Sequence, residues 1–420
     1  MDHDLERQPQ ALHLDQDRRR DPRTTRLISS TDPRRRTLVL EFIVGASAVS
    51  IGWSQYFNSA LAALGTPLPG AIAGGEGAAV DLSAAAIALI LTAVLVAGIR
   101  LSSAINNLIV VIKLAVVGFF LLFGAFFVTA ANWSPFVPPA KPGGPAGGGL
   151  DTPLWQLIFG TPGTFGFQGI VAGAALVFFA YIGFDIVATA AEETRSPQRD
   201  MPIGILGSLG ICALLYVAVS LVLTGIVAYP RLNTAAPMAT ALAATGNRWA
   251  TALISLGAIV GLLAVILILL LGQSRVAFAM SRDGLLPTWF ARVHPRFRSP
   301  YRITILTGLV VAVVAAFTPI VDVAELVNIG TLFAFILVSA GVLVLRRTRP
   351  DLPRAFRTPW VPLVPILAVL VSLYLMLNLA GWTWVRFVVW MVIGLAIYFG
   401  YGVRNSHLAR RETEEATPRG

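Results

Sequence analysis

The stretch WATALISLGAIVGLLAVILILLLGQS at residues 249–274 decides the fold class, because it contains no charged residue. A helix needs about 20 apolar residues to cross a bilayer whose hydrocarbon core is about 30 Å thick. The apolar residues are continuous and do not alternate at period two, which favours a helix over a strand of a membrane barrel. This stretch therefore predicts one membrane-spanning helix.

Comparable stretches recur along the whole chain. Of its 420 residues, 56% are hydrophobic and only 13% are charged, whereas soluble proteins carry roughly a quarter charged residues. We predict an all-α integral membrane protein with a transmembrane domain over 37–403, a disordered basic tail at 1–36 and a cytoplasmic tail at 404–420. The ten predicted segments lie near 37–64, 80–99, 104–130, 166–191, 202–228, 249–280, 302–317, 323–345, 360–377 and 382–403.

The basic residues predict the orientation of these segments. If the N-terminus is cytoplasmic, most of the 32 Lys and Arg residues fall in cytoplasmic stretches. The opposite side then holds only Lys141, Arg231, Arg248 and Arg386. Cytoplasmic loops of membrane proteins carry such an excess, so we expect a multi-pass protein of the plasma membrane with both termini in the cytoplasm. The net charge of +10 is thereby explained without nucleic-acid binding.

The sequence shows no sign of a metal centre, a cofactor or an enzymatic site. The single cysteine, Cys212, excludes a disulfide framework within the chain. All four histidines lie outside the predicted segments. No nucleophile elbow, phosphate loop or cluster of catalytic groups is present, so we expect a protein that is not an enzyme and that needs no cofactor.

Lys113 is the most informative residue inside a predicted segment. It follows Arg100 by thirteen residues, which places it about 20 Å further along a helix, near the middle of a bilayer. Snorkelling of the ammonium group to an interface is the alternative, and the depth makes it difficult. Because burial disfavours the charged form of lysine, this residue is suited to gaining and losing a proton.

Asp185 is the second ionisable candidate inside a segment. The small residues Ala180 and Gly183 precede it and bracket a possible helix break, where backbone groups become available to a substrate. An ordinary helix with an aspartate near its cytoplasmic end explains the pattern equally well. Glu41 and Glu325 lie near segment ends, where a helix cap or an interface anchor is as good an explanation as function.

Six strings of sequence resemble bacterial amino acid permeases of the amino acid–polyamine–organocation superfamily, and especially the cationic amino acid transporter group. They occur in the family order from about residue 38 to residue 403. The strings are VIKLAVV at 111–117, VFFAYIGFD at 177–185, AAEETRSPQRDMPIGI at 190–205, GQSRVAFAMSRDGLLP at 272–287, VHPRFRSPYRITILTG at 293–308 and VAELVNIGTLFAF at 323–335.

The resemblance implies a leucine-transporter-like fold of two inverted five-helix repeats, with substrate bound at broken helices. The stretch 166–191 then corresponds to the sixth family helix and 104–130 to the fifth. Lys113 matches a lysine linked to proton coupling, so the expected partners are an amino acid, protons and the lipid bilayer. The residues that match the substrate pocket are Phe179, Ala180, Ile182, Gly183 and Asp185 on the sixth helix, and Val44 and Ala48 on the third.

The start of the chain departs from the family pattern. EFIVGASAVSIGWSQYFNSAL at 41–61 resembles the third family helix, and residues 1–36 resemble no family sequence. We therefore expect a chain that lacks the first two family helices. The expected function is proton-coupled amino acid transport, and the alternative is a non-functional or partner-dependent fragment of such a permease.

Overall fold

The computed structural model describes residues 34–74, 78–98, 103–140, 149–160, 165–181, 183, 196–232, 234, 236–282, 287–295, 297, 299–351 and 358–397. Within these ranges all regular elements are helices. The α-helices are α3 (Arg34–Ala63), α4 (Leu82–Val96), α5 (Ser103–Ala125), α6 (Leu154–Phe159), α7 (Gly166–Val177), α9 (Pro197–Ile226), α10 (Pro237–Ala244), α11 (Arg248–Arg282), α12 (Tyr301–Phe317), α13 (Ile320–Thr348), α14 (Leu363–Leu377) and α15 (Gly381–Ile397). Short 3₁₀ turns connect them, of which η3 (Phe178–Tyr181) matters most below.

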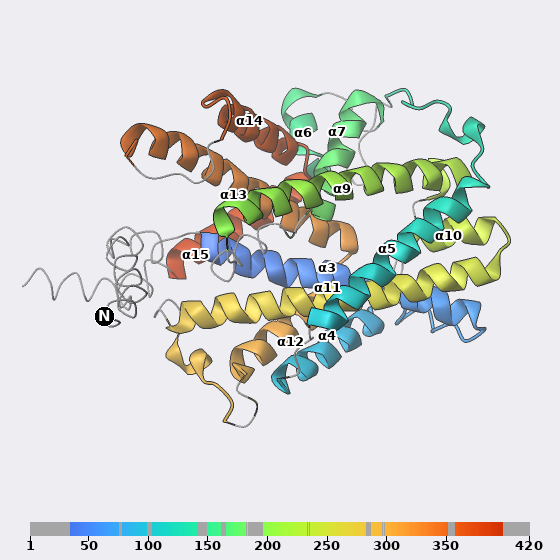
Figure 1. The fold of residues 1–420 in the computed structure, drawn as a ribbon, viewed down its shortest axis with the longest axis horizontal. Coiled ribbons are helices and arrows are strands. Elements are labelled where there is room, and N and C mark those ends of the chain that lie inside the picture. The colour runs from blue at the N-terminus through green and yellow to red at the C-terminus, as the bar shows by residue number, and fades with distance from the viewer. Residues whose placement is uncertain are drawn as a thin grey trace, which may run out of the picture.

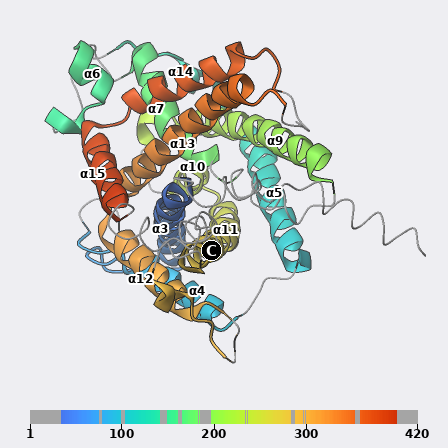
Figure 2. The ribbon, with the colours of Figure 1, turned by 90° about the vertical axis from the view of Figure 1, so that its left-hand side faces the viewer.

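Helices α3 and α11 lie side by side through the middle of the molecule (Figures 1 and 2). They run antiparallel, since Gly45 lies against Leu269 and Gly272 lies against Phe42. The glycines let the two backbones approach closely, which is the usual basis of helix association where lipid removes the hydrophobic driving force.

Helices α4 and α12 pack against this pair and complete one apolar interior. Residues from all four helices form a single buried cluster, in which Phe42 of α3, Leu91 of α4 and Val311 of α12 take part. Asp81 joins α3 to the start of α4, because its carboxylate accepts hydrogen bonds from the Ala84 N–H (2.9 Å) and the Ser54 hydroxyl (2.6 Å). A side-chain acceptor of this kind satisfies a free N–H at a helix N-terminus.

The remaining helices surround this interior in two groups. Helices α7, α14 and α15 pack against α13, which itself contacts α3 (Figure 2). Helices α5 and α9 contact each other, while α5 also packs on α11 and α10 packs on both α9 and α11. Helix α13 therefore links the central pair to the segment that contains α7.

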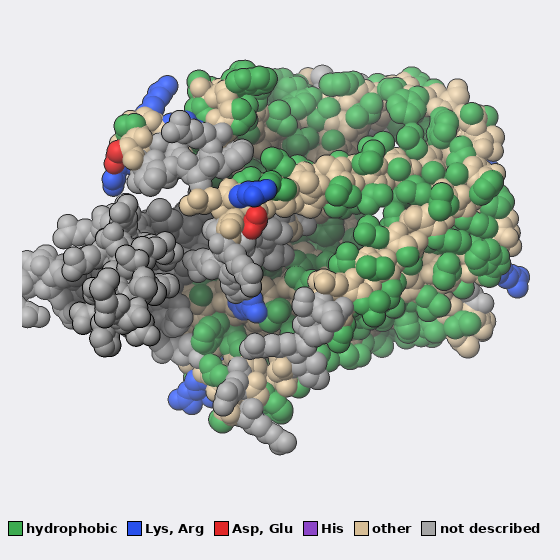
Figure 3. Space-filling view, in the orientation of Figure 1, with side chains coloured by type: hydrophobic (Ala, Val, Ile, Leu, Met, Phe, Trp, Pro, Cys, Tyr) green, Lys and Arg blue, Asp and Glu red, His purple; other side chains and the backbone are tan. Residues whose placement is uncertain are grey.

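The outer surface has the character expected of a protein embedded in lipid. Within the described part of the chain, four helices are long and apolar enough to cross a membrane: α5, α9, α11 and α13. Large apolar side chains of α5 and α9 are exposed, such as Leu122 and Leu214. Figure 3 shows that apolar side chains dominate this face and that charged ones gather near its ends. Soluble proteins rarely expose an apolar surface that continues over several helices.

The prediction of an all-α membrane protein is confirmed, and each predicted segment contains a helix. Differences occur at segment ends and in connections. The segment predicted at 166–191 is α-helical only to Val177. The short helices α6 and α10 were not predicted, because neither is long enough to produce a membrane-spanning apolar run. The tails before residue 34 and after residue 397 lie outside the described residues.

Candidate substrate site at the break after α7

The chain stops being α-helical at Val177 and continues as the 3₁₀ turn η3, Phe178–Tyr181. Gly183 follows with a φ of +131°, a conformation that glycine adopts readily and other residues rarely do. The last four carbonyls of an α-helix lack the partners that the helix interior provides, and here side chains from other helices bind carbonyls of the last turn and of η3. Ile182 and Asp185, both predicted as site residues, lie outside the described residues.

Phe179, on η3, packs against residues of other helices, which include α3. It packs against a buried set that we call the Val44 cluster: Val44, Ala48, Ile51, Ala84, Ala315, Val323 and Val327. Val44 and Ala48 are 3% and 1% exposed. Three predicted pocket residues, one on η3 and two on α3, are thus brought together around one apolar surface.

Tyr216 of α9 holds η3 from another direction. Its hydroxyl donates a 2.8 Å hydrogen bond to the carbonyl of Ala180, another predicted site residue. The ring of Tyr216 also meets that of Tyr181 edge to face, with the ring centroids 5.4 Å apart. The backbone of η3 is therefore fixed by a side chain that comes from a separate helix.

Lys113 lies at a different interface, between α5 and α11. Its aliphatic stem covers Gly261 of α11, so that a Cβ added there would lie only 3.2 Å from the Lys113 Cγ and Cε atoms. The side chain is half-buried, in the middle of a helix that is long and apolar enough to span a membrane. A charged group at this depth is costly and is by default a functional candidate.

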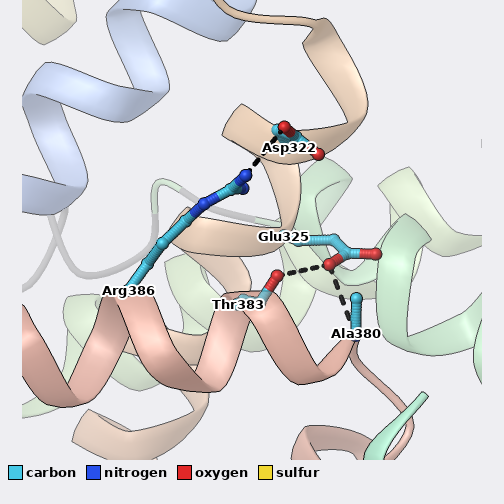
Figure 4. A network of polar contacts seen from close by, with 5 residues as sticks. All are labelled: Asp322, Glu325, Ala380, Thr383 and Arg386. Atoms are coloured by element: carbon cyan, nitrogen blue, oxygen red, sulfur yellow. Dashed lines mark hydrogen bonds and ion pairs between the residues drawn. The ribbon is translucent and has the colours of Figure 1, made fainter. Parts of the chain in front are cut away.

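Glu325 connects α13 to the start of α15. Its Oε2 atom accepts hydrogen bonds from the Thr383 hydroxyl and, at 3.4 Å, from the Ala380 N–H (Figure 4). One turn away, Arg386 forms a 3.1 Å salt bridge with Asp322. Glu325 thus caps a neighbouring helix, which agrees with the structural explanation considered for it. Glu41, in contrast, is 4% exposed within α3 and is not an anchor at the surface.

A cavity of about 530 Å³ lies elsewhere, and no predicted pocket residue that the structure describes lines it. Its walls come from the turn after α5, from α6 and from the facing ends of α7 and α9, and include Trp133, Phe165 and Tyr229. Among the described residues, no group of three or more His, Cys, Asp or Glu could hold a metal ion.

Sequence reasoning missed Tyr216 and Asn328, which both bind the backbone around the break. Asn328 of α13 donates hydrogen bonds to the carbonyls of Ala175 and Leu176. The available signal was an uncharged polar residue within an apolar segment, in VAELVNIGTLFAF. Neither side chain carries a charge at neutral pH, so neither stands out in the sequence as an unfavourable group inside a membrane segment.

Comparison with known proteins supports one family. The family model described as amino acid permease matches residues 37–402. The methylthioribose transporter of Bacillus subtilis (strain 168) is 43% identical over 375 residues, which cover 88% of this chain and 76% of that protein. The branched-chain amino acid permease BcaP of the same organism is 43% identical over 378 residues, with the same coverage. The vacuolar cationic amino acid transporter 4 of Arabidopsis thaliana is 37% identical over 318 residues, or 75% of this chain and 50% of that protein.

Proposed function

The chain belongs to the amino acid permease family, and from this premise we propose that it is a proton-coupled secondary transporter whose substrate binds at the break after α7. The observation that carries the proposal is the meeting of Phe179 with the Val44 cluster beside η3. A broken helix supplies backbone groups for the charged ends of an amino acid, and an apolar wall suits its side chain.

The substrate we propose is a neutral amino acid with an aliphatic side chain. The Val44 cluster, against which Phe179 packs, is apolar, and the family members named above include a branched-chain amino acid permease. A cationic substrate is the second candidate, because a cationic amino acid transporter is also a relative and Asp185 would suit a positive side chain. Competition by valine, isoleucine, arginine and methylthioribose against labelled leucine distinguishes these classes.

We propose Lys113 as the proton-coupling residue. It is the basic group on the spanning helix α5, and its stem lies against α11, the central helix that also packs on α3. A proton gained or lost there changes the charge at the interface of α5 and α11. This change can favour one conformation of the transporter over another. The orientation we propose has both termini cytoplasmic, in the plasma membrane, since most basic residues then lie inside.

The test is uptake of labelled leucine into proteoliposomes under an inward proton gradient. We expect the wild-type chain to accumulate substrate and Lys113→Ala to fall to the level of empty liposomes. Arg386→Gln is the matched control, because it removes a basic group whose side chain is 42% exposed. We expect it to transport normally.

Three outcomes would count against the proposal. Accumulation that persists after an uncoupler is added contradicts proton coupling. Normal uptake by Lys113→Ala contradicts the role of that lysine. Absence of uptake by the wild-type chain alone favours a partner-dependent protein, whereas robust uptake contradicts that alternative.

A further inference from the structure

Asn328 binds the last turn of α7 from the side. Its Nδ2 atom donates to the Ala175 carbonyl at 2.9 Å and to the Leu176 carbonyl at 2.8 Å. Both carbonyls belong to the final turn of a helix, where intrahelical partners run out. Two carbonyl acceptors at these distances also settle which side-chain atom of Asn328 is the nitrogen.

The NH₂ group of Asn328 makes the stabilising contacts of this side chain. Asn328 is 0% exposed, and its Oδ1 atom is buried with no hydrogen-bond partner among the described residues. A buried acceptor without a partner costs free energy, and an apolar side chain of similar size would avoid that cost. The contribution of Asn328 therefore comes from its two N–H donors, which reach across to α7.

The residues on either side of Asn328 hold it rigidly. Val327 belongs to the Val44 cluster, against which Phe179 packs. Ile329 belongs to a second buried cluster, which includes Ala175 of α7 and Met376 of α14. Asn328 thus projects from a part of α13 that is packed on both sides, and its position relative to α7 is set by those contacts.

We propose that Asn328 is a positioning residue for transport. By satisfying two carbonyls of the last turn, it sets where α7 stops and η3 begins, and so holds the η3 backbone and Phe179 against the Val44 cluster. The effect on transport rests on the proposed site at the break, whereas the effect on the local backbone does not.

The test compares Asn328→Leu and Asn328→Ser with wild type and with Thr331→Val. Leucine is close in size to asparagine and has no donor. Serine is small and polar, and it lacks the two N–H groups. Thr331 is the matched control because it lies one turn further along α13, is 3% exposed, and donates a hydrogen bond within its own helix, to the Val327 carbonyl.

Two readouts are taken on the full-length protein. Hydrogen exchange of the amides in 175–181 reports the local backbone, and the Michaelis constant and maximal rate of uptake per folded protein report transport. We expect both Asn328 variants to exchange faster at 175–181 and to raise KM about tenfold, because two buried hydrogen bonds are lost. The maximal rate should stay within about twofold, and Thr331→Val should resemble wild type.

Unchanged exchange at 175–181 together with unchanged KM in both variants would overturn the proposal. A lower thermal stability with wild-type KM and wild-type local exchange would also overturn it, because Asn328 would then have a purely structural role. If Asn328→Leu fails to accumulate in membranes, Asn328→Ser decides the matter. Absence of uptake in the wild type contradicts the proposed function, and the exchange data then still decide whether Asn328 fixes the break.

Discussion

The centre of the molecule and the break after α7 are stabilised in different ways. In the centre, α3, α4, α11 and α12 share one buried apolar cluster, and glycines bring the backbones together. At the break, hydrogen bonds from Asn328 and Tyr216 hold backbone carbonyls that the helix no longer pairs. Packing distributed over many contacts resists change, whereas a few polar contacts can be exchanged for others. The break, where we propose that substrate binds, is therefore held by contacts that can be exchanged more easily than the central packing.

The largest expected effect comes from Gly308→Leu, which attacks the central packing. A Cβ at Gly308 would lie 2.0 Å from the Thr92 Oγ1 atom, and Thr92 is itself bonded to its own helix. Overpacking of this kind costs about 1–3 kcal/mol or more. We expect a marked fall in the thermal unfolding temperature, measured on purified protein. Gly341→Leu on α13 is the control, because nothing lies within 4 Å of its added Cβ. Equal stability of the two variants would mean that the centre is not tightly packed.

An intermediate effect is expected from Tyr216→Phe, which removes one polar contact at the break. The bond to the Ala180 carbonyl is lost while the ring stays against Tyr181. One hydrogen bond contributes about 0.5–1.5 kcal/mol, so KM for uptake should rise about two- to tenfold with little change in unfolding temperature. Tyr229→Phe serves as the control, since this tyrosine lines the separate cavity. A fall in stability comparable to that of Gly308→Leu would contradict the distinction between the two regions.

The smallest effect is expected from Arg386→Gln. The salt bridge to Asp322 joins two packed helices, α13 and α15, but its side chains are 42% and 40% exposed. Exposed ion pairs contribute about 0–1 kcal/mol. We expect the unfolding temperature and KM to stay close to wild type at physiological salt. A large change in KM would show that polar contacts far from the break also control the substrate site.

The sequence predicts a helix well where the length of its apolar run is enough to identify it. Apolar runs long enough to cross a bilayer locate α5, α9, α11 and α13 to within about five residues at each end, and α11 is the clearest case. The rule fails for α10, which has only eight residues and begins with a proline. The length of the apolar run also does not locate the end of α7 at Val177, because the run continues beyond that point, although Ala180 and Gly183 indicated a possible helix break close by.

The candidate site could be predicted only in part. The resemblance to known permeases indicated Phe179, Val44 and Ala48, and the structure brings them around one apolar surface. It gave no reason to choose Asn328 or Tyr216, since neither is charged. Their importance depends on which carbonyls their helices face, and that is a property of tertiary packing. The predicted placement of Asp185 at the site remains a prediction.

The length of α11 has a consequence for how the molecule sits in its surroundings. A continuous helix of 35 residues is about 52 Å long, whereas the bilayer with its headgroups is about 40–45 Å thick. The helix must lean steeply or extend beyond the lipid. The start of α11 packs in a separate cluster with Phe120 and Leu242, and residues within 266–270 in its middle pack in the centre. The helix then continues without a break into its final turns, which begin at Arg275. A displacement of these final turns would therefore be transmitted along α11 to the residues that pack on α3.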